Sequence, residues 1–211
     1  MKVLFFGDSI TDMERNRNVD IGEYRSFGLG YPAVIASRLS EKDPIAYQVI
    51  NRGIGGNRIV DLYARIKADV WNLEPDVLTI LIGINDIWHE VHSKNGVELD
   101  RFEKFYRMII EETKAKLPNV KIVILEPFVL AGSANEGHFE EFNEIRTYAK
   151  VIKKVAQELD CYFIPLQEKF DKAEEKYGGK IYLFDGVHPN IAGATLIANE
   201  WLKVFTNEID K

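Results

Sequence analysis

Short apolar runs alternate with longer amphipathic stretches along the chain of 211 residues. Five of these runs, rich in Val, Ile, Leu and Phe, have the length and composition of strands that are buried on both faces. The stretches between them carry apolar residues at helical spacing, most clearly over residues 102–113 and 145–159. The alternation predicts an α/β fold in which helices cover both faces of a parallel sheet. The predicted strands are Val3–Phe6, Tyr47–Ile50, Val77–Ile82, Val120–Leu125 and Tyr162–Ile164.

Two prolines mark the starts of further helices. Pro32 suits a first helical turn, because the N–H that proline lacks would have no partner there. A last helix is expected after Pro189, from about Ile191 to Phe205. No composition break, internal repeat or low-complexity tract divides the chain, so we predict a single domain over residues 1–211.

Composition and charge argue against several classes of partner. The net charge of −6 comes without any basic cluster, whereas nucleic-acid binding needs a concentrated positive surface. No stretch reaches the roughly 18 apolar residues that span a bilayer, so we expect no membrane partner. The N-terminal apolar run Val3–Phe6 is too short for the core of a signal peptide, so we expect a soluble cytoplasmic protein.

The cysteine and the acidic residues near Ser9 have structural interpretations. Cys161 is the single cysteine, and in a strand-like segment we expect it to behave as a small apolar residue. For Asp8 and Asp12 we predict structural hydrogen bonds, because no metal-ligand spacing such as His-x-x-x-His accompanies them. We therefore expect no metal and no cofactor. The remaining histidines are interpreted as solvated loop residues: His89, His92 and His138.

Chemically suggestive residues follow three of the predicted strands. Ser9 comes after the first strand, Gly56 after the second and Asn85 after the third. The carboxyl ends of parallel strands lie at one edge of a sheet, so these residues are expected to share a site. Taken alone, Gly7-Asp8-Ser9 could instead be a turn that merely ends a strand.

A second group of candidates lies near the C-terminus. Asp185 and His188 are three residues apart, in a segment where Gly186 gives the backbone freedom and Pro189 stiffens the exit. A neutral imidazole held by a carboxylate is what a serine hydroxyl needs in order to become a nucleophile. The pair could also be a helix N-cap with a nearby histidine.

A glycine N–H and an asparagine side chain could complete an oxyanion hole. Gly55-Gly56 allows close backbone approach, and the Asn85 amide could donate to a developing alkoxide. The surrounding segment Gly53–Asn57 has neither Walker spacing nor the full Gly-x-Gly-x-x-Gly pattern, so a nucleotide site is not expected.

The sequence motifs around Ser9, Gly56, Asn85 and the Asp185/His188 pair, in this order, resemble those of the SGNH (GDSL-type) hydrolase superfamily. The resemblance implies a flavodoxin-like three-layer α/β/α sandwich with a five-stranded parallel sheet. It also implies Ser9 as nucleophile, His188 as base and Asp185 as its partner, with an oxyanion hole made by the Ser9 N–H, the Gly56 N–H and the Asn85 side chain. The motifs are Gly7-Asp8-Ser9, Gly56, Gly83-x-Asn85-Asp86 and Asp185-x-x-His188-Pro189.

The first half of the chain is similar to a bacterial branch of that superfamily, the acetylxylan and xylo-oligosaccharide acetyl esterases. This similarity implies a serine esterase that removes short acyl groups, acetyl above all, from carbohydrates through an acyl-enzyme. It leaves homo-oligomerisation open. Phe184 departs from it, because a tryptophan is expected before the catalytic aspartate. Trp88 could wall the acyl pocket, stack on a sugar or simply pack on its neighbours. The segments that carry the similarity are residues 6–12, 30–31, 51–57, 61–62 and 82–88.

Two alternatives stay open at this stage. A lipolytic esterase, lysophospholipase or thioesterase would use the same triad on longer acyl chains. A carbohydrate-binding protein could keep the fold without catalysis.

Overall fold

The computed structural model describes residues 1–210, and in that range it contains one five-stranded parallel sheet with the order β2-β1-β3-β4-β5. Every predicted strand is present. The second strand runs three residues beyond its predicted end because Asn51–Gly53 pair with Phe5–Gly7. The strands are β1 (Lys2–Gly7), β2 (Gln48–Gly53), β3 (Val77–Leu81), β4 (Lys121–Leu125) and β5 (Tyr162–Ile164).

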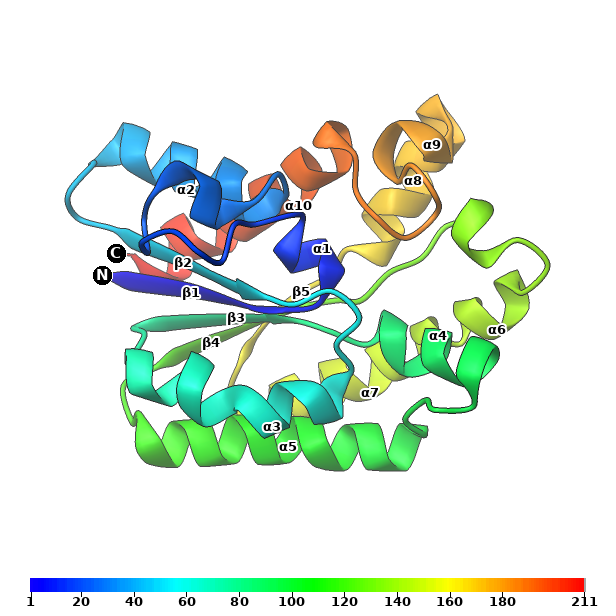
Figure 1. The fold of residues 1–211 in the computed structure, drawn as a ribbon, viewed down its shortest axis with the longest axis horizontal. Coiled ribbons are helices and arrows are strands. Elements are labelled where there is room, and N and C mark those ends of the chain that lie inside the picture. The colour runs from blue at the N-terminus through cyan, green and yellow to red at the C-terminus, as the bar shows by residue number, and fades with distance from the viewer. Residues whose placement is uncertain (211) are drawn as a thin grey trace.

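Helices cover both faces of this sheet (Figure 1). On one face lie α2 (Tyr31–Lys42) and α10 (Ile191–Val204), and on the other lie α3 (Ile59–Asp69), α5 (Leu99–Lys116) and α7 (Ile145–Glu158). The prediction of a flavodoxin-like three-layer α/β/α sandwich is therefore confirmed. Within residues 1–210, no helix is long and apolar enough to cross a membrane. The shorter helices are α1 (Ser9–Asp12), α4 (Ile84–Ser93), α6 (Phe139–Asn143), α8 (Gln167–Tyr177) and α9 (Gly179–Tyr182).

A buried hydrogen bond fixes α10 to the middle of the sheet. Trp201 on this helix is fully buried, and its ring lies 5.5 Å from that of Phe5 on β1. Its indole N–H donates to the hydroxyl of Thr79 on β3 at 2.9 Å, which satisfies two polar groups that burial would otherwise leave without partners. The position of α10 sets the position of the loop that precedes it.

The order of the strands creates a switch point between β1 and β3. These two strands are neighbours in the sheet, but the chain leaves β1 toward β2 and leaves β3 toward β4. Ligands of open α/β sheets bind outside the carboxyl ends of the strands at such a point. Ser9 and Asn85 follow β1 and β3 directly, so the fold places both at this crevice.

Cys161 has the surroundings expected of a structural thiol. Its side chain is half-buried and donates to the carbonyl of Leu159 at 3.5 Å. Burial raises the pKa of the thiol to about 11, so it stays protonated and weakly nucleophilic near neutral pH.

Candidate active site

Ser9 begins the one-turn helix α1 directly after β1. Asp8 caps this turn, since its carboxylate accepts the Ile10 N–H at 2.9 Å. Gly7 permits the close packing beneath the turn: a Cβ at this position would lie 2.4 Å from the carbonyl oxygen of Leu81. The turn therefore both ends the strand and presents the serine at the edge of the sheet.

The structure brings together the three residues predicted to form the triad. The Ser9 Oγ lies 2.9 Å from the His188 Nε2, across 179 positions of sequence. The His188 Nδ1 lies 2.7 Å from an Asp185 carboxylate oxygen. An ionised carboxylate only accepts hydrogen bonds, so Nδ1 carries the proton and Nε2 is left to accept from the serine hydroxyl. This is the tautomer that a general base for Ser9 requires.

The backbone of its own loop holds the Asp185 carboxylate in place. The second carboxylate oxygen accepts the N–H groups of Val187 at 2.9 Å and His188 at 2.8 Å. Asp185 is not a helix N-cap, because α10 begins later and Asn190 occupies its cap position. Gly186 adopts a φ of +93°, and a Cβ there would lie 2.5 Å from the carbonyl oxygen of Leu130. Only glycine fits this turn without strain.

Asp185 and His188 each stabilise the charged form of the other. Burial alone would raise the pKa of Asp185, but hydrogen bonds from the His188 side chain and from two backbone N–H groups outweigh it and lower the pKa. Burial would lower the pKa of His188, but the hydrogen bond and charge of Asp185 outweigh this effect and raise it above 6.5. The carboxylate thus stabilises the imidazolium that forms when the histidine takes a proton.

The loop after β2 leaves a single backbone N–H without a partner. Gly55 donates to an Asp12 carboxylate oxygen at 3.0 Å, and Asn57 donates to the Ile54 carbonyl at 3.2 Å. Between them, the Gly56 N–H has no acceptor among the described residues. Gly56 has a φ of +79°, and its Cβ position faces open space. Its N–H is therefore available to a ligand, as the predicted oxyanion donor must be.

The Asn85 side chain is positioned by the same loop. It is nearly buried, and its amide donates one hydrogen to the carbonyl of Asn57 at 3.1 Å. An amide nitrogen carries two hydrogens, so the second stays available. The Ser9 N–H also has no partner among the described residues, and a Cβ on Gly55 would lie only 3.8 Å from the serine Cβ. Each of the three predicted oxyanion donors thus has an N–H without a partner among the described residues.

One residue that the sequence did not point to links the parts of this site. Arg65 on α3 donates from Nε to the Asn57 side chain at 2.7 Å and from Nη2 to the Gly7 carbonyl at 3.0 Å. Its Nη1 donates to the Arg52 carbonyl at 2.9 Å and to Asp69 at 2.7 Å. The guanidinium therefore joins the end of β1, the end of β2 and the loop that holds Asn85. No short motif marks such a residue, because two of its four partners are backbone carbonyls.

Aromatic rings flank the base on two sides. The Phe184 ring is stacked on the His188 ring with centroids 5.7 Å apart, and it is 49% exposed. Trp88 lies 6.1 Å from His188 and 5.3 Å from the buried ring of Phe142. Trp88 therefore packs on its neighbours and also borders the site, while Phe184 presents an open apolar surface beside it.

The prediction that the remaining histidines are loop residues was wrong for two of them. His89 and His92 lie in α4, and only His138 lies outside a helix. The His92 ring contacts the Trp88 ring at 6.1 Å and the His138 ring at 5.7 Å. The helical spacing of Ile84, Ile87, Trp88 and Val91 is the signal that could have identified α4.

The two acidic residues beside Ser9 make the structural contacts predicted for them. Asp12 accepts from Gly55 and forms an ion pair with Arg17. Asp8 is fully buried; one of its oxygens caps α1 and the other has no hydrogen-bond partner among the described residues. Burial raises the pKa of Asp8 to about 7. In residues 1–210, no group of three or more His, Cys, Asp or Glu side chains is placed to hold a metal ion.

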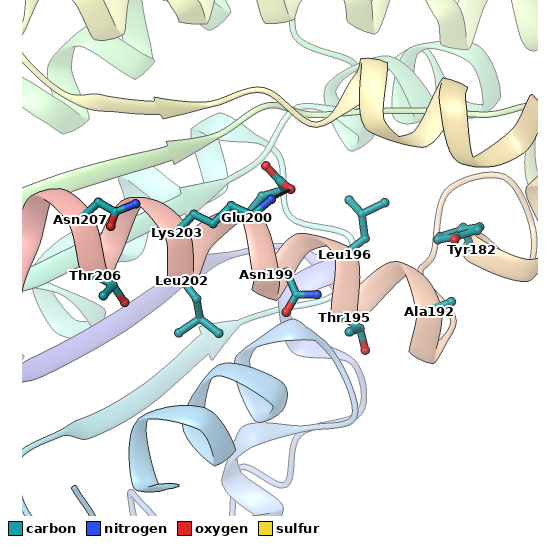
Figure 2. Close-up of a pocket in the computed structure, with 10 residues that line it drawn as sticks. All are labelled: Tyr182, Ala192, Thr195, Leu196, Asn199, Glu200, Leu202, Lys203, Thr206 and Asn207. Atoms are coloured by element: carbon teal, nitrogen blue, oxygen red, sulfur yellow. Dashed lines mark hydrogen bonds and ion pairs between the residues drawn. The ribbon is translucent and has the colours of Figure 1, made fainter. Parts of the chain in front are cut away.

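Two large hollows lie elsewhere. One, of about 860 Å³, runs along α10, and Figure 2 shows that its lining side chains come from that helix, from Tyr182 and from Thr206 and Asn207 just beyond the helix. Another, of about 740 Å³, lies among α4, α6 and α7. None of the triad residues lines either hollow.

Comparisons with known proteins agree with this arrangement. Residues 5–196 match the GDSL-like Lipase/Acylhydrolase family. The chain is 34% identical to an acetylxylan esterase of Geobacillus stearothermophilus over 208 residues, which is 96% of this chain and 92% of that protein. The solved structure of that enzyme has a TM-score of 0.85, at 34% identity, and the match covers 96% of this chain and 92% of that one.

A second solved structure is equally similar. A protein of Parabacteroides merdae ATCC 43184 assigned to the GDSL-like lipases has a TM-score of 0.86 and 36% identity, covering 97% of this chain and 95% of that chain. Family and fold thus agree over nearly the whole sequence, and the resemblance predicted from four short blocks is confirmed. The chain belongs to the GDSL-like lipase/acylhydrolase family.

Proposed function

We propose that this protein is a serine esterase that hydrolyses short-chain acyl esters of carbohydrates, acetyl esters above all, through an acyl-enzyme intermediate. The observation that carries the proposal is the continuous hydrogen-bonded series from Ser9 through His188 to Asp185, with distances of 2.9 and 2.7 Å. Membership of the acylhydrolase family supports the reaction class.

In the first half of the reaction, His188 accepts the hydroxyl proton of Ser9 as the Oγ attacks the ester carbonyl. The carbonyl oxygen becomes an oxyanion, and the N–H groups of Ser9, Gly56 and Asn85 receive it. The imidazolium then protonates the leaving alcohol, and the acyl group stays on Ser9. Asp185 stays ionised and keeps the imidazole in its required orientation.

In the second half, water replaces the alcohol. His188 takes a proton from this water, which attacks the acyl-enzyme carbonyl, and the same donors receive the second oxyanion. Collapse of this intermediate releases the carboxylic acid and returns the proton to Ser9. The reaction therefore needs no group beyond the side chains and backbone N–H groups already named.

The substrate class rests on similarity and on the aromatic surroundings of the site. The relative from Geobacillus stearothermophilus is an acetylxylan esterase, and its solved structures include catalytic mutants of a serine, an aspartate and a histidine. In this chain Phe184 exposes an apolar ring beside His188, where it could border the sugar that carries the ester.

A fluorophosphonate probe tests the nucleophile directly. Wild-type protein should be labelled at Ser9, and Ser9→Ala should not be labelled although it folds. Ser40→Ala serves as a matched control, because Ser40 is an exposed residue near the end of α2 and makes no hydrogen bond to the site within the described residues. Folded wild-type protein that resists labelling would remove Ser9 from the mechanism.

A comparison of substrates tests the acyl preference. Acetylated xylo-oligosaccharides and aryl acetate should be cleaved with a higher kcat/KM than the octanoyl ester or an acyl thioester of the same chain length. A preference for octanoyl esters would favour a lipolytic enzyme, and a preference for the thioester would favour a thioesterase. Either result would leave the triad intact and change only the substrate.

A further inference from the structure

A small polar cavity lies beside the edge strand β2, outside the catalytic triad. Its volume is about 130 Å³. We call it the arginine cavity, because the guanidinium-bearing side chains of three arginines line it together with smaller polar residues. The polar residues of its lining are Arg15, Asn16, Arg17, Ser26, Asn51 and Arg52.

Arg52 has no hydrogen-bond acceptor among the described residues. Its side chain is only 26% exposed, and its nearest carboxylate is that of Asp69, at 3.9 Å. The Nε atom is buried and has no partner. A guanidinium carries five N–H donors, and leaving buried donors unpaired is costly, so this side chain has bonding capacity that the protein itself does not use.

Arg15 is similarly short of partners. Its side chain is 7% exposed, and its Nε donates to the Gly53 carbonyl at 2.8 Å. Its terminal nitrogens make no hydrogen bond within the described residues, and the Asp12 carboxylate is 3.9 Å from Nε. Burial, together with the positive charges of Arg17 and Arg52, lowers the pKa of Arg15 to about 10 against the opposing effect of Asp12.

Positive charge exceeds negative charge around the cavity. Arg65 donates to the Arg52 carbonyl and also pairs with Asp69. Among the described residues, the carboxylates within 4 Å of these four guanidinium groups are therefore two, those of Asp12 and Asp69. Asp12 is already shared by Arg17 and a backbone N–H. Charges removed from water without a counter-charge destabilise a fold, and an anion placed here would offset that cost.

We propose that the arginine cavity binds a tetrahedral oxyanion, phosphate or sulfate, between Arg15, Arg17 and Arg52. Planar guanidinium groups donate paired hydrogen bonds to such oxyanions in the geometry that phosphate recognition commonly uses. At about 30 Å³ for each water, the cavity holds roughly four waters, which suits the four oxygens of one such ion. The hydroxyl of Ser26 and the amide of Asn16 supply further donors.

Thermal unfolding measured with inorganic phosphate tests the proposal. At constant ionic strength set with chloride, phosphate at 100 times its Kd should raise the Tm of the wild-type protein by about 5–10 °C. Titration calorimetry should give one site per chain. Glucose 6-phosphate in a parallel titration distinguishes a site for the free ion from one that accepts a phosphate ester, and binding of either supports the oxyanion class.

Arg52→Gln is the informative variant. This side chain makes no hydrogen bond to residues 1–210, so its replacement should leave the fold intact while it abolishes the Tm shift. Arg38→Gln is the matched control: Arg38 is an exposed arginine paired with Glu41 on α2, and its loss should leave the phosphate shift unchanged.

Two results would overturn the proposal. One is that neither phosphate nor glucose 6-phosphate gives a shift larger than that of chloride at equal ionic strength, and the other is an equal shift in Arg52→Gln. Because binding is measured without any ester, these outcomes are independent of the proposed esterase activity. Ser9→Ala should bind phosphate as the wild type does.

Discussion

The triad loop and the arginine cavity are both polar and partly buried, yet they differ in how fully their groups are paired. Around Asp185, each carboxylate oxygen accepts at least one hydrogen bond, and the imidazole of His188 has a partner on both nitrogens. The Arg52 guanidinium, by contrast, has no hydrogen-bond acceptor in the part of the chain that the structure describes. A fully paired network is rigid and ready before substrate arrives, whereas an unpaired one gains its order from a ligand. Substitutions in the triad loop should therefore lower turnover, whereas substitutions in the arginine cavity should abolish the phosphate effect on Tm and leave turnover nearly unchanged.

The largest effect is expected at Asp185. Asp185→Asn keeps the size of the side chain but favours the wrong tautomer of His188, so kcat should fall by about 10⁴. Circular dichroism should show an unchanged fold. Steady-state kinetics on an aryl acetate measures the loss, and near-full activity would contradict the assigned role.

A smaller but clear loss is expected at Arg65. Arg65→Lys keeps the charge but cannot hold Gly7, Arg52 and Asn57 at once, so the oxyanion donors should be displaced. Complete removal of one oxyanion donor lowers kcat by a factor of about 10²–10³. A displaced donor should lower kcat by a factor of about 10–10², with little change in KM. Asp69→Asn is the control, because it leaves the three contacts of Arg65 to the site intact. A rise in KM at constant kcat would show that Arg65 acts on substrate binding instead.

The pH dependence of kcat/KM tests the charge coupling between Asp185 and His188. The base must be neutral, so activity is lost as pH falls through the pKa of His188. Asp185 raises this pKa, so the midpoint of the acid limb should lie above 6.5. In Asp185→Asn the opposing effect of burial remains, and the midpoint of the residual activity should move to lower pH. A midpoint that does not move would contradict the coupling.

Asp8 offers a test on stability. Its pKa is raised by burial from 3.8 to about 7, so the native state holds a proton that the unfolded chain releases between these pH values. The free energy of unfolding of the wild type should therefore decrease as pH rises through this window. Asp8→Asn cannot ionise and keeps an acceptor for the Ile10 N–H. The Tm of this variant should exceed that of the wild type only at higher pH, with no difference near pH 4 and the largest difference above pH 7. The corresponding gain in the free energy of unfolding is at most about 4 kcal/mol.

The smallest effect on turnover is expected in the arginine cavity. Without added phosphate, Arg52→Gln should change kcat/KM on an aryl acetate by less than about twofold and should leave the Tm equal or slightly higher, because it removes an uncompensated charge. A loss of activity comparable to that of Arg65→Lys would mean that the cavity belongs to the catalytic machinery, and the contrast between the two regions would disappear.

The sequence predicted those features whose signal is local. Buried strands such as Val3–Phe6 are continuous apolar runs, and the triad residues lie in short motifs. The order of the motifs identified the family, although neither Gly7-Asp8-Ser9 nor the Asp185/His188 pair was decisive alone. Parallel topology then explains why residues from distant segments meet at one edge of the sheet.

Features that depend on tertiary contacts were not predictable in this way. Two of the four partners of Arg65 are backbone carbonyls, which every residue possesses, and the fold brings the Asn57 side chain to it, so its sequence neighbours do not reveal it. The unpaired state of Arg52 depends on the distance to Asp69, which only the fold sets. His92 was misassigned because the polar residues around it hid the apolar stripe of α4.

The 179 positions between Ser9 and His188 have a consequence for how the protein is made. A ribosome delivers the nucleophile early and the base late, and Trp201 must follow before α10 can dock on Thr79 and hold the base in place. Under the proposed mechanism, a nascent chain cannot cleave esters before Trp201 has been added and α10 has docked. Ester hydrolysis therefore reports that translation has passed α10 and that the segments carrying Ser9 and His188 have folded together.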